Sequence, residues 1–175
     1  MNEPYEDAYT AIRRAYSMPR AQASSLNLQR KERGHDDLDR MEMIAQDAMV
    51  RVMAEQHCGK LSQASWVVLW SDDPELMIVA LKQFQAAFAK PGRTAPLGWV
   101  ADISQQWANR KDRTARITAA PTRSDTEWGG ILGIDRRTAG AWRRELQEQL
   151  HTANRSGLQT AGYILKSRGL IPGEL

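Results

Sequence analysis

The chain has little of what metal sites, disulfides and membrane anchors require. It contains a single cysteine, Cys58, and three histidines among 175 residues. A lone cysteine cannot form an intramolecular disulfide, and it suits a reducing compartment. No CxxC or HxxxH spacing occurs, so a recognisable zinc site is missing. No apolar run approaches the roughly 18 residues of a membrane-spanning helix, and no signal peptide is visible. We therefore expect a cytoplasmic protein without metal or membrane contact.

Sequence motifs for catalysis are also missing. There is no Walker loop, no GxGxxG and no GxSxG. His57 and Cys58 are neighbours, so on a helix their side chains diverge by about 100° and do not form a nucleophile–base pair. Asp36, Asp37 and Asp39 resemble part of a calcium loop but lack its glycine and terminal glutamate. We expect no catalytic residues, no enzymatic activity and no cofactor.

The charge is small in total but unevenly distributed. The net charge is +3. Residues 110–144 carry nine basic side chains against four acidic ones, whereas residues 36–56 carry six acidic side chains against two basic ones. This asymmetry indicates one surface for an anionic polymer and a second surface for a different partner.

Helical patterns are frequent and strand signals are weak along the whole chain, so we expect an all-α fold. The apolar spacing predicts helices over about 4–17, 37–57, 62–70, 74–90, 97–116, 125–132, 136–151 and 158–168. Asp36 or Asp37 is expected to cap the second of these and Ser62 the third. Asp73 followed by proline predicts the start of the fourth. Asn154 and Gly157 are expected to separate the last two.

These elements predict an N-terminal helical bundle followed by a C-terminal region with a helix-turn-helix. The expected regions are a short N-terminal helix (1–18), a basic connector (19–35), a helical partner or dimerisation region (36–91), and a DNA-binding region that includes the C-terminal helix (92–175). Most of the six tryptophans are expected to anchor the helical core.

The most informative stretch is residues 125–144, DTEWGGILGIDRRTAGAWRR. Ser124 and Glu127 have the spacing of a capping box at the start of a short helix. Gly133 is placed where a tight turn needs a residue that tolerates positive φ. Asp135 is expected to cap a second helix, which carries four arginines. Two helices joined by a short glycine-containing turn form a helix-turn-helix.

This stretch resembles the helix-turn-helix family of DNA-binding proteins. The positions that match the family pattern are Gly129, Gly133, Ile134, Thr138, Ala139 and Trp142. Ala139 departs from the pattern, because valine or isoleucine is usual there, and Trp142 is expected to fill the missing volume. The resemblance covers about twenty of the 175 residues. It implies DNA binding and names no operator.

The resemblance and the basic residues together predict the DNA contacts. The second helix of the motif is expected to present Arg136, Arg137, Thr138, Gly140, Ala141, Arg143 and Arg144 to the DNA. Further basic residues are expected on or near the phosphate backbone: Arg110, Lys111, Arg113, Arg116 and Arg123.

From these features we expect a sequence-specific DNA-binding regulator of transcription. A phage- or plasmid-type activator or antitermination factor is the favoured interpretation. It would bind double-stranded DNA as a monomer or dimer and contact RNA polymerase or another protein through residues 36–90. Two alternatives stay open. One is a DNA-packaging or replication-initiation subunit, and the other is a protein–protein inhibitor module with an incidental helix pair.

Overall fold

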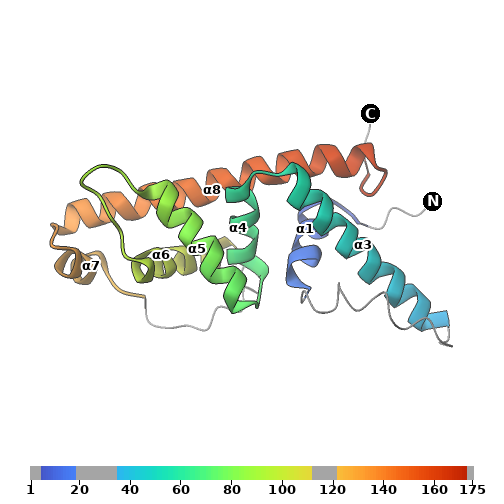
Figure 1. Ribbon diagram of the computed structural model, residues 1–175, viewed down its shortest axis with the longest axis horizontal. Coiled ribbons are helices and arrows are strands. Elements are labelled where there is room, and N and C mark those ends of the chain that lie inside the picture. Colours follow the sequence, from blue (N-terminus) through green and yellow to red (C-terminus); the bar gives the residue numbers. More distant parts are fainter. Residues whose placement is uncertain (1–4, 19–34, 112–121, 173–175) are drawn as a thin grey trace.

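The computed structural model describes residues 5–18, 35–111 and 122–172, and these residues form helices with no β-strand (Figure 1). The helices are α1 (Ala8–Ser17), α3 (His35–His57), α4 (Lys60–Trp70), α5 (Pro74–Phe88), α6 (Leu97–Lys111), α7 (Asp125–Leu132) and α8 (Arg136–Ser167). The fold is therefore all-α, as the sequence predicted. No helix within these ranges is both long enough and apolar enough to cross a membrane.

Helix α8 organises the molecule. It spans 32 residues, and Figure 1 shows it lying along the length of the protein. It contacts α6 and α7 as well as α1, α3 and α4. Regions that are distant in sequence are therefore joined by one continuous helix. Its C-terminus ends in a Schellman motif, with Gly169 at φ 67° and the Leu170 N–H donating to the Leu165 carbonyl.

The predicted break at Asn154 and Gly157 is wrong, because α8 runs straight through both residues. A Cβ atom on Gly157 would lie 2.5 Å from the Cβ atom of Ser62 and 2.6 Å from the Trp66 ring of α4. The buried Asn154 side chain accepts a hydrogen bond from Trp66 Nε1 at 3.1 Å. Both residues are poor helix formers that are retained where α8 approaches α4 closely. Packing against α4 offsets their weak helix propensity.

Helix α4 is the most buried element of the core. Eight of its eleven residues are buried, as expected for a helix that is apolar on nearly every face. It packs against α5 and α8 and also contacts α1, α3 and α6. The helix begins at Lys60 with Gly59 as its N-cap, and Ser62 lies buried inside it. The expectation that Ser62 caps this helix is therefore wrong.

The other helix starts show which local signals were reliable. The Asp73 carboxylate accepts hydrogen bonds from the backbone N–H groups of Glu75 and Leu76, as predicted. Helix α3 already begins at His35, so Asp36 and Asp37 lie inside its first turn and not at its N-cap. Of the predicted helix 97–116, only the part to Lys111 lies within the described residues.

The tryptophans anchor the core, as expected. Trp66, Trp70, Trp99, Trp107 and Trp128 are buried, and Trp142 is partly buried. Large rings bury much apolar area and tolerate edge-to-face contacts with one another.

Candidate nucleic-acid interface

Helix α7 starts with the predicted capping box. The Ser124 hydroxyl accepts a hydrogen bond from the Glu127 N–H at 3.3 Å, and the Glu127 carboxylate accepts one from the Ser124 N–H at 2.7 Å. The second bond, together with a bond from the Ser124 hydroxyl, lowers the pKa of Glu127. This carboxylate is engaged locally, and the start of α7 is fixed by residues three positions apart.

The turn between α7 and α8 depends on two glycines. Gly133 adopts φ 67°, the left-handed conformation that the sequence predicted. Its N–H and that of Ile134 both donate to the Gly129 carbonyl. A Cβ atom on Gly129 would lie 2.8 Å from the Ile134 carbonyl oxygen. Only glycine at position 129 lets the turn fold this closely over α7.

Helix α8 begins at the predicted cap, Asp135. Its carboxylate accepts hydrogen bonds from the Thr138 N–H at 3.0 Å and from the Thr138 hydroxyl at 2.6 Å. These bonds lower the pKa of Asp135. The Thr138 hydroxyl proton is therefore used within the cap, so the residue supports the start of α8 directly.

Two residues that were expected to contact DNA point towards α7 instead. Arg143 forms an ion pair with Asp125, with 2.8 Å between Nη2 and Oδ2. Gly140 is buried, and a Cβ atom there would lie 3.0 Å from the same Asp125 oxygen. The structure therefore places Gly140 and Arg143 between the helices. Arg143 lies four residues after the buried Ala139 and three before the buried Leu146, so the helical period also places it on the buried side of α8.

The opposite side of the first turns of α8 is exposed and basic. Arg136, Arg137, Ala141 and Arg144 are all exposed. Within the described ranges none of these arginines forms an ion pair. Asp125 is paired with Arg143, while Glu127 and Asp135 stay ionised in their caps. The three exposed arginines therefore outnumber the two remaining carboxylates, and a small excess of positive charge is left at the start of α8.

Helix α6 positions α7 and adds basic residues. The Asp102 carboxylate accepts hydrogen bonds from Trp128 Nε1 and, at 3.0 Å, from the Arg123 N–H. The Arg123 guanidinium lies 5.0 Å from the centre of the Trp128 ring. Arg110 and Lys111 are exposed at the C-terminal end of α6. The predicted contacts Arg113 and Arg116 fall outside the described residues.

A cluster of charged and aromatic side chains, which the sequence did not predict, holds the middle of α8 in place. The Glu145 carboxylate accepts hydrogen bonds from Arg93 at 2.6 Å and from Lys90 at 2.7 Å, and these bonds hold its pKa at about 2. The Arg93 guanidinium also lies 3.8 Å from the centre of the Phe88 ring and 5.6 Å from that of Trp142. Through Arg93, the segment between α5 and α6 therefore contributes an anchor for α8.

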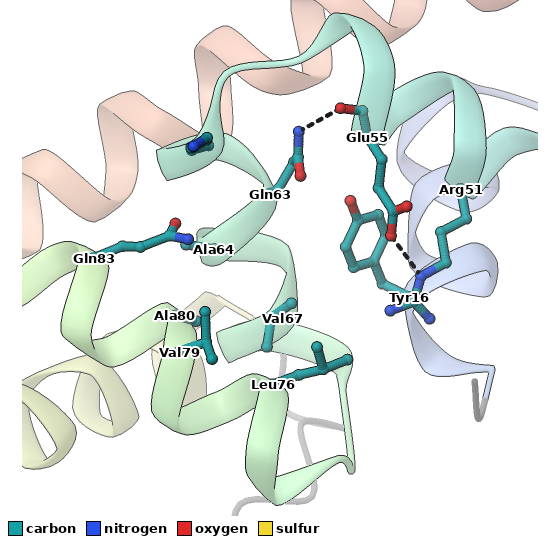
Figure 2. A pocket seen from close by; sticks show the side chains of 11 residues that line it. Tyr16, Arg51, Glu55, Gln63, Ala64, Val67, Leu76, Val79, Ala80 and Gln83 are labelled. Atoms are coloured by element: carbon teal, nitrogen blue, oxygen red, sulfur yellow. Dashed lines mark hydrogen bonds and ion pairs between the residues drawn. The ribbon is translucent and has the colours of Figure 1, made fainter. Parts of the chain in front are cut away.

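A cavity of about 300 Å³ opens between α1, α3, α4 and α5 (Figure 2). Its lining mixes apolar residues such as Val67 and Leu76 with polar and charged ones. Arg51 is buried and forms an ion pair with Glu55 at 3.2 Å. Gln63 donates to three carbonyls, including that of Cys58 at 2.7 Å, at the end of α3. No histidine, cysteine, serine or aspartate is among the described residues that line it.

Within the described residues, no three His, Cys, Asp or Glu side chains cluster in a way that could hold a metal ion. Comparisons with known proteins match no protein-family model, no curated protein and no solved structure.

Proposed function

We propose that this protein binds double-stranded DNA sequence-specifically through α7, the glycine turn and the start of α8, and that it regulates transcription. The observation that carries the proposal is the exposed set Arg136, Arg137 and Arg144, which has no ion-pair partner among the described residues. In helix-turn-helix proteins the N-terminal part of the second helix enters the major groove. The same part of α8 carries these arginines.

The spacing of the exposed residues suits contacts with base edges. Arg137, Ala141 and Arg144 recur at intervals of four and three residues, so they lie on one face of α8. Seven residues of helix separate the two arginines by about 10 Å, or about three base pairs at 3.4 Å each. Ala141 is small and lets this face approach the bases. Arginine can donate two hydrogen bonds to one guanine, which makes it suitable for base readout.

The neighbouring basic residues suit the phosphate backbone. Arg123 precedes α7, and Arg110 and Lys111 lie at the end of α6. Side chains at such helix ends would orient the protein on DNA without reading its sequence. The hydrogen bonds of Asp102 to Trp128 and to Arg123 hold α6 and α7 together, so these cations would act as one positioned group.

The half of the molecule formed by α1, α3, α4 and α5 would provide the regulatory contact. Helix α3 exposes the apolar side chains of Met49 and Val52 and the acidic side chain of Glu42. Exposed apolar side chains suit a protein partner better than DNA, so a protein such as RNA polymerase is the proposed partner there. The protein would act in the cytoplasm, where DNA and polymerase are present.

The test begins by selecting bound duplexes from a random DNA pool with the full chain. Arg137→Ala should then weaken binding to the selected sequence by ~1–3 kcal/mol if Arg137 donates two hydrogen bonds to guanine, with a smaller loss on random DNA. Lys82→Ala removes an exposed charge on α5 and should change neither affinity. An equal loss on both DNAs would assign Arg137 to phosphates. If no duplex binds at physiological salt, the proposed function is wrong.

A further inference from the structure

The cavity between α1, α3, α4 and α5 is lined largely by one face of α4 and one face of α5. Each of these two helices contributes four lining residues with spacings of three, one and three: Lys60, Gln63, Ala64 and Val67 on α4, and Leu76, Val79, Ala80 and Gln83 on α5. Residues at these spacings lie on one side of a helix. The two helices pack together and are joined by residues 71–73 alone, so they form an antiparallel hairpin.

The hairpin gives the cavity a polar end and an apolar end. Lys60 and Gln83 lie far from the connection between the two helices, whereas Val67 and Leu76 lie close to it. Figure 2 shows the side chain of Gln83 extending from α5 towards α4. The Val79 side chain adds apolar surface that is 52% exposed. A molecule that fits both ends has a polar head and an apolar body.

The charge that is left open in this lining is positive. Arg51 is satisfied within the protein, because its Nε donates to Glu55 at 3.2 Å and its Nη1 to the Met18 carbonyl at 3.3 Å. Its guanidinium also lies 5.1 Å from the centre of the Tyr16 ring. Lys60 forms no ion pair with any described residue. The Lys60 ammonium is therefore available to an anion.

The amide of Gln83 has hydrogen-bonding capacity that the described part of the protein does not use. Its Oε1 atom is buried and accepts no hydrogen bond there. Unpaired buried polar atoms are uncommon in folded proteins, and a missing ligand or water is one of their ordinary explanations. Rotation about the last side-chain bond exchanges the positions of the amide oxygen and the amide N–H groups, so Gln83 can donate into the cavity.

We infer that this cavity binds a small organic carboxylate with an apolar body. Lys60 and the Gln83 amide hold the carboxylate, and Val67, Leu76 and Val79 contact the body. The volume of about 300 Å³ lies near the lower limit for ligand pockets. It admits a compact molecule of about ten to fifteen non-hydrogen atoms. This binding does not depend on the proposed function.

The experiment titrates the full chain with three probes and follows backbone and glutamine side-chain amides by NMR. Phenylpropionate carries both a carboxylate and an apolar ring, phenylpropanamide is its neutral counterpart of the same size, and acetate is the head group alone. Titration to about 10 mM covers the weak affinity expected of so small a ligand. The variants are Lys60→Gln at the polar end and Val79→Thr at the apolar end, and Lys82→Gln on α5, outside the lining, is the matched control. All three positions are exposed, and circular dichroism melting checks that each variant is folded.

Phenylpropionate should shift the resonances of the lining residues in a saturable way, and acetate should not. The wild type should bind phenylpropionate about fivefold more tightly than phenylpropanamide, the gain expected of one exposed ion pair. Lys60→Gln should bind the two aromatic probes alike. Val79→Thr should bind both about threefold more weakly, because a methyl group in contact with the ligand is lost. Lys82→Gln should match the wild type.

The inference is overturned if phenylpropionate causes no saturable shift of the lining residues, or if the wild type binds both aromatic probes equally. It is also overturned if Lys60→Gln retains the preference for the carboxylate, if Lys82→Gln loses that preference, or if Val79→Thr binds as the wild type does. Because no DNA is present in these titrations, such results leave the proposed function unaffected. A failure of the chain to bind duplex DNA likewise leaves the carboxylate site standing.

Discussion

Replacing Gly157 by alanine tests the close approach of α8 to α4 on which the whole arrangement depends. In an ordinary helix interior, glycine to alanine stabilises by about 1 kcal/mol. At position 157 the added Cβ atom would lie 2.5 Å from Ser62 Cβ and 2.6 Å from the Trp66 ring. Overpacking of this kind costs about 1–3 kcal/mol. Because both neighbours are buried side chains, we expect the upper part of that range and a net loss of about 1–2 kcal/mol.

Thermal and urea unfolding followed by circular dichroism measure this effect. For a chain of this size, the loss corresponds to a Tm lower by about 3–6 °C. Gly162→Ala is the matched control on the same helix, because its Cβ atom would lie 3.6 Å from Ala8 Cβ, an ordinary contact. That variant should be more stable than the wild type by about 0.5–1 kcal/mol. If Gly157→Ala stabilises as much as Gly162→Ala, the helices do not cross as described.

Three further predictions follow from local features. Gly133→Val should destabilise the α7–α8 turn by about 1–3 kcal/mol, because valine is strained at φ 67°; unfolding curves with unchanged midpoints would contradict this. The pKa of Glu145 is about 2, below its usual 4.5, so its ion pairs stabilise the fold above about pH 4.5 and cease to do so as the pH falls through about 2. The stability advantage over Glu145→Gln, measured by urea unfolding, should shrink across that window, and a constant advantage would show that the ion pairs do not cause it. Burial raises the pKa of the Cys58 thiol, so Ellman's reagent should label it only after denaturation, and rapid labelling of the native protein would contradict its burial.

Local sequence was enough to define the helix ends whose signals lie within a few residues. Asp73 before Pro74, the Ser124–Glu127 capping box and Gly133 all have the predicted geometry. Each depends on hydrogen bonds or backbone angles between near neighbours, so the residue types alone determine it. The all-α fold was predicted for a similar reason, because apolar spacing along one segment decides its amphipathic face.

Tertiary contacts decided the features that local reasoning got wrong or missed. Gly157 is a helix breaker by propensity, yet it lies inside α8 because Ser62 and Trp66, about 90 residues earlier, leave no space for a side chain. The ion pair of Arg143 likewise depends on Asp125 of another helix, which the local pattern of four arginines does not show. Such outcomes depend on the free energy of contacts between distant segments, which exceeds the small differences in helix propensity. Whether such contacts outweigh helix propensity therefore depends on the tertiary structure, which brings the partner helix into contact.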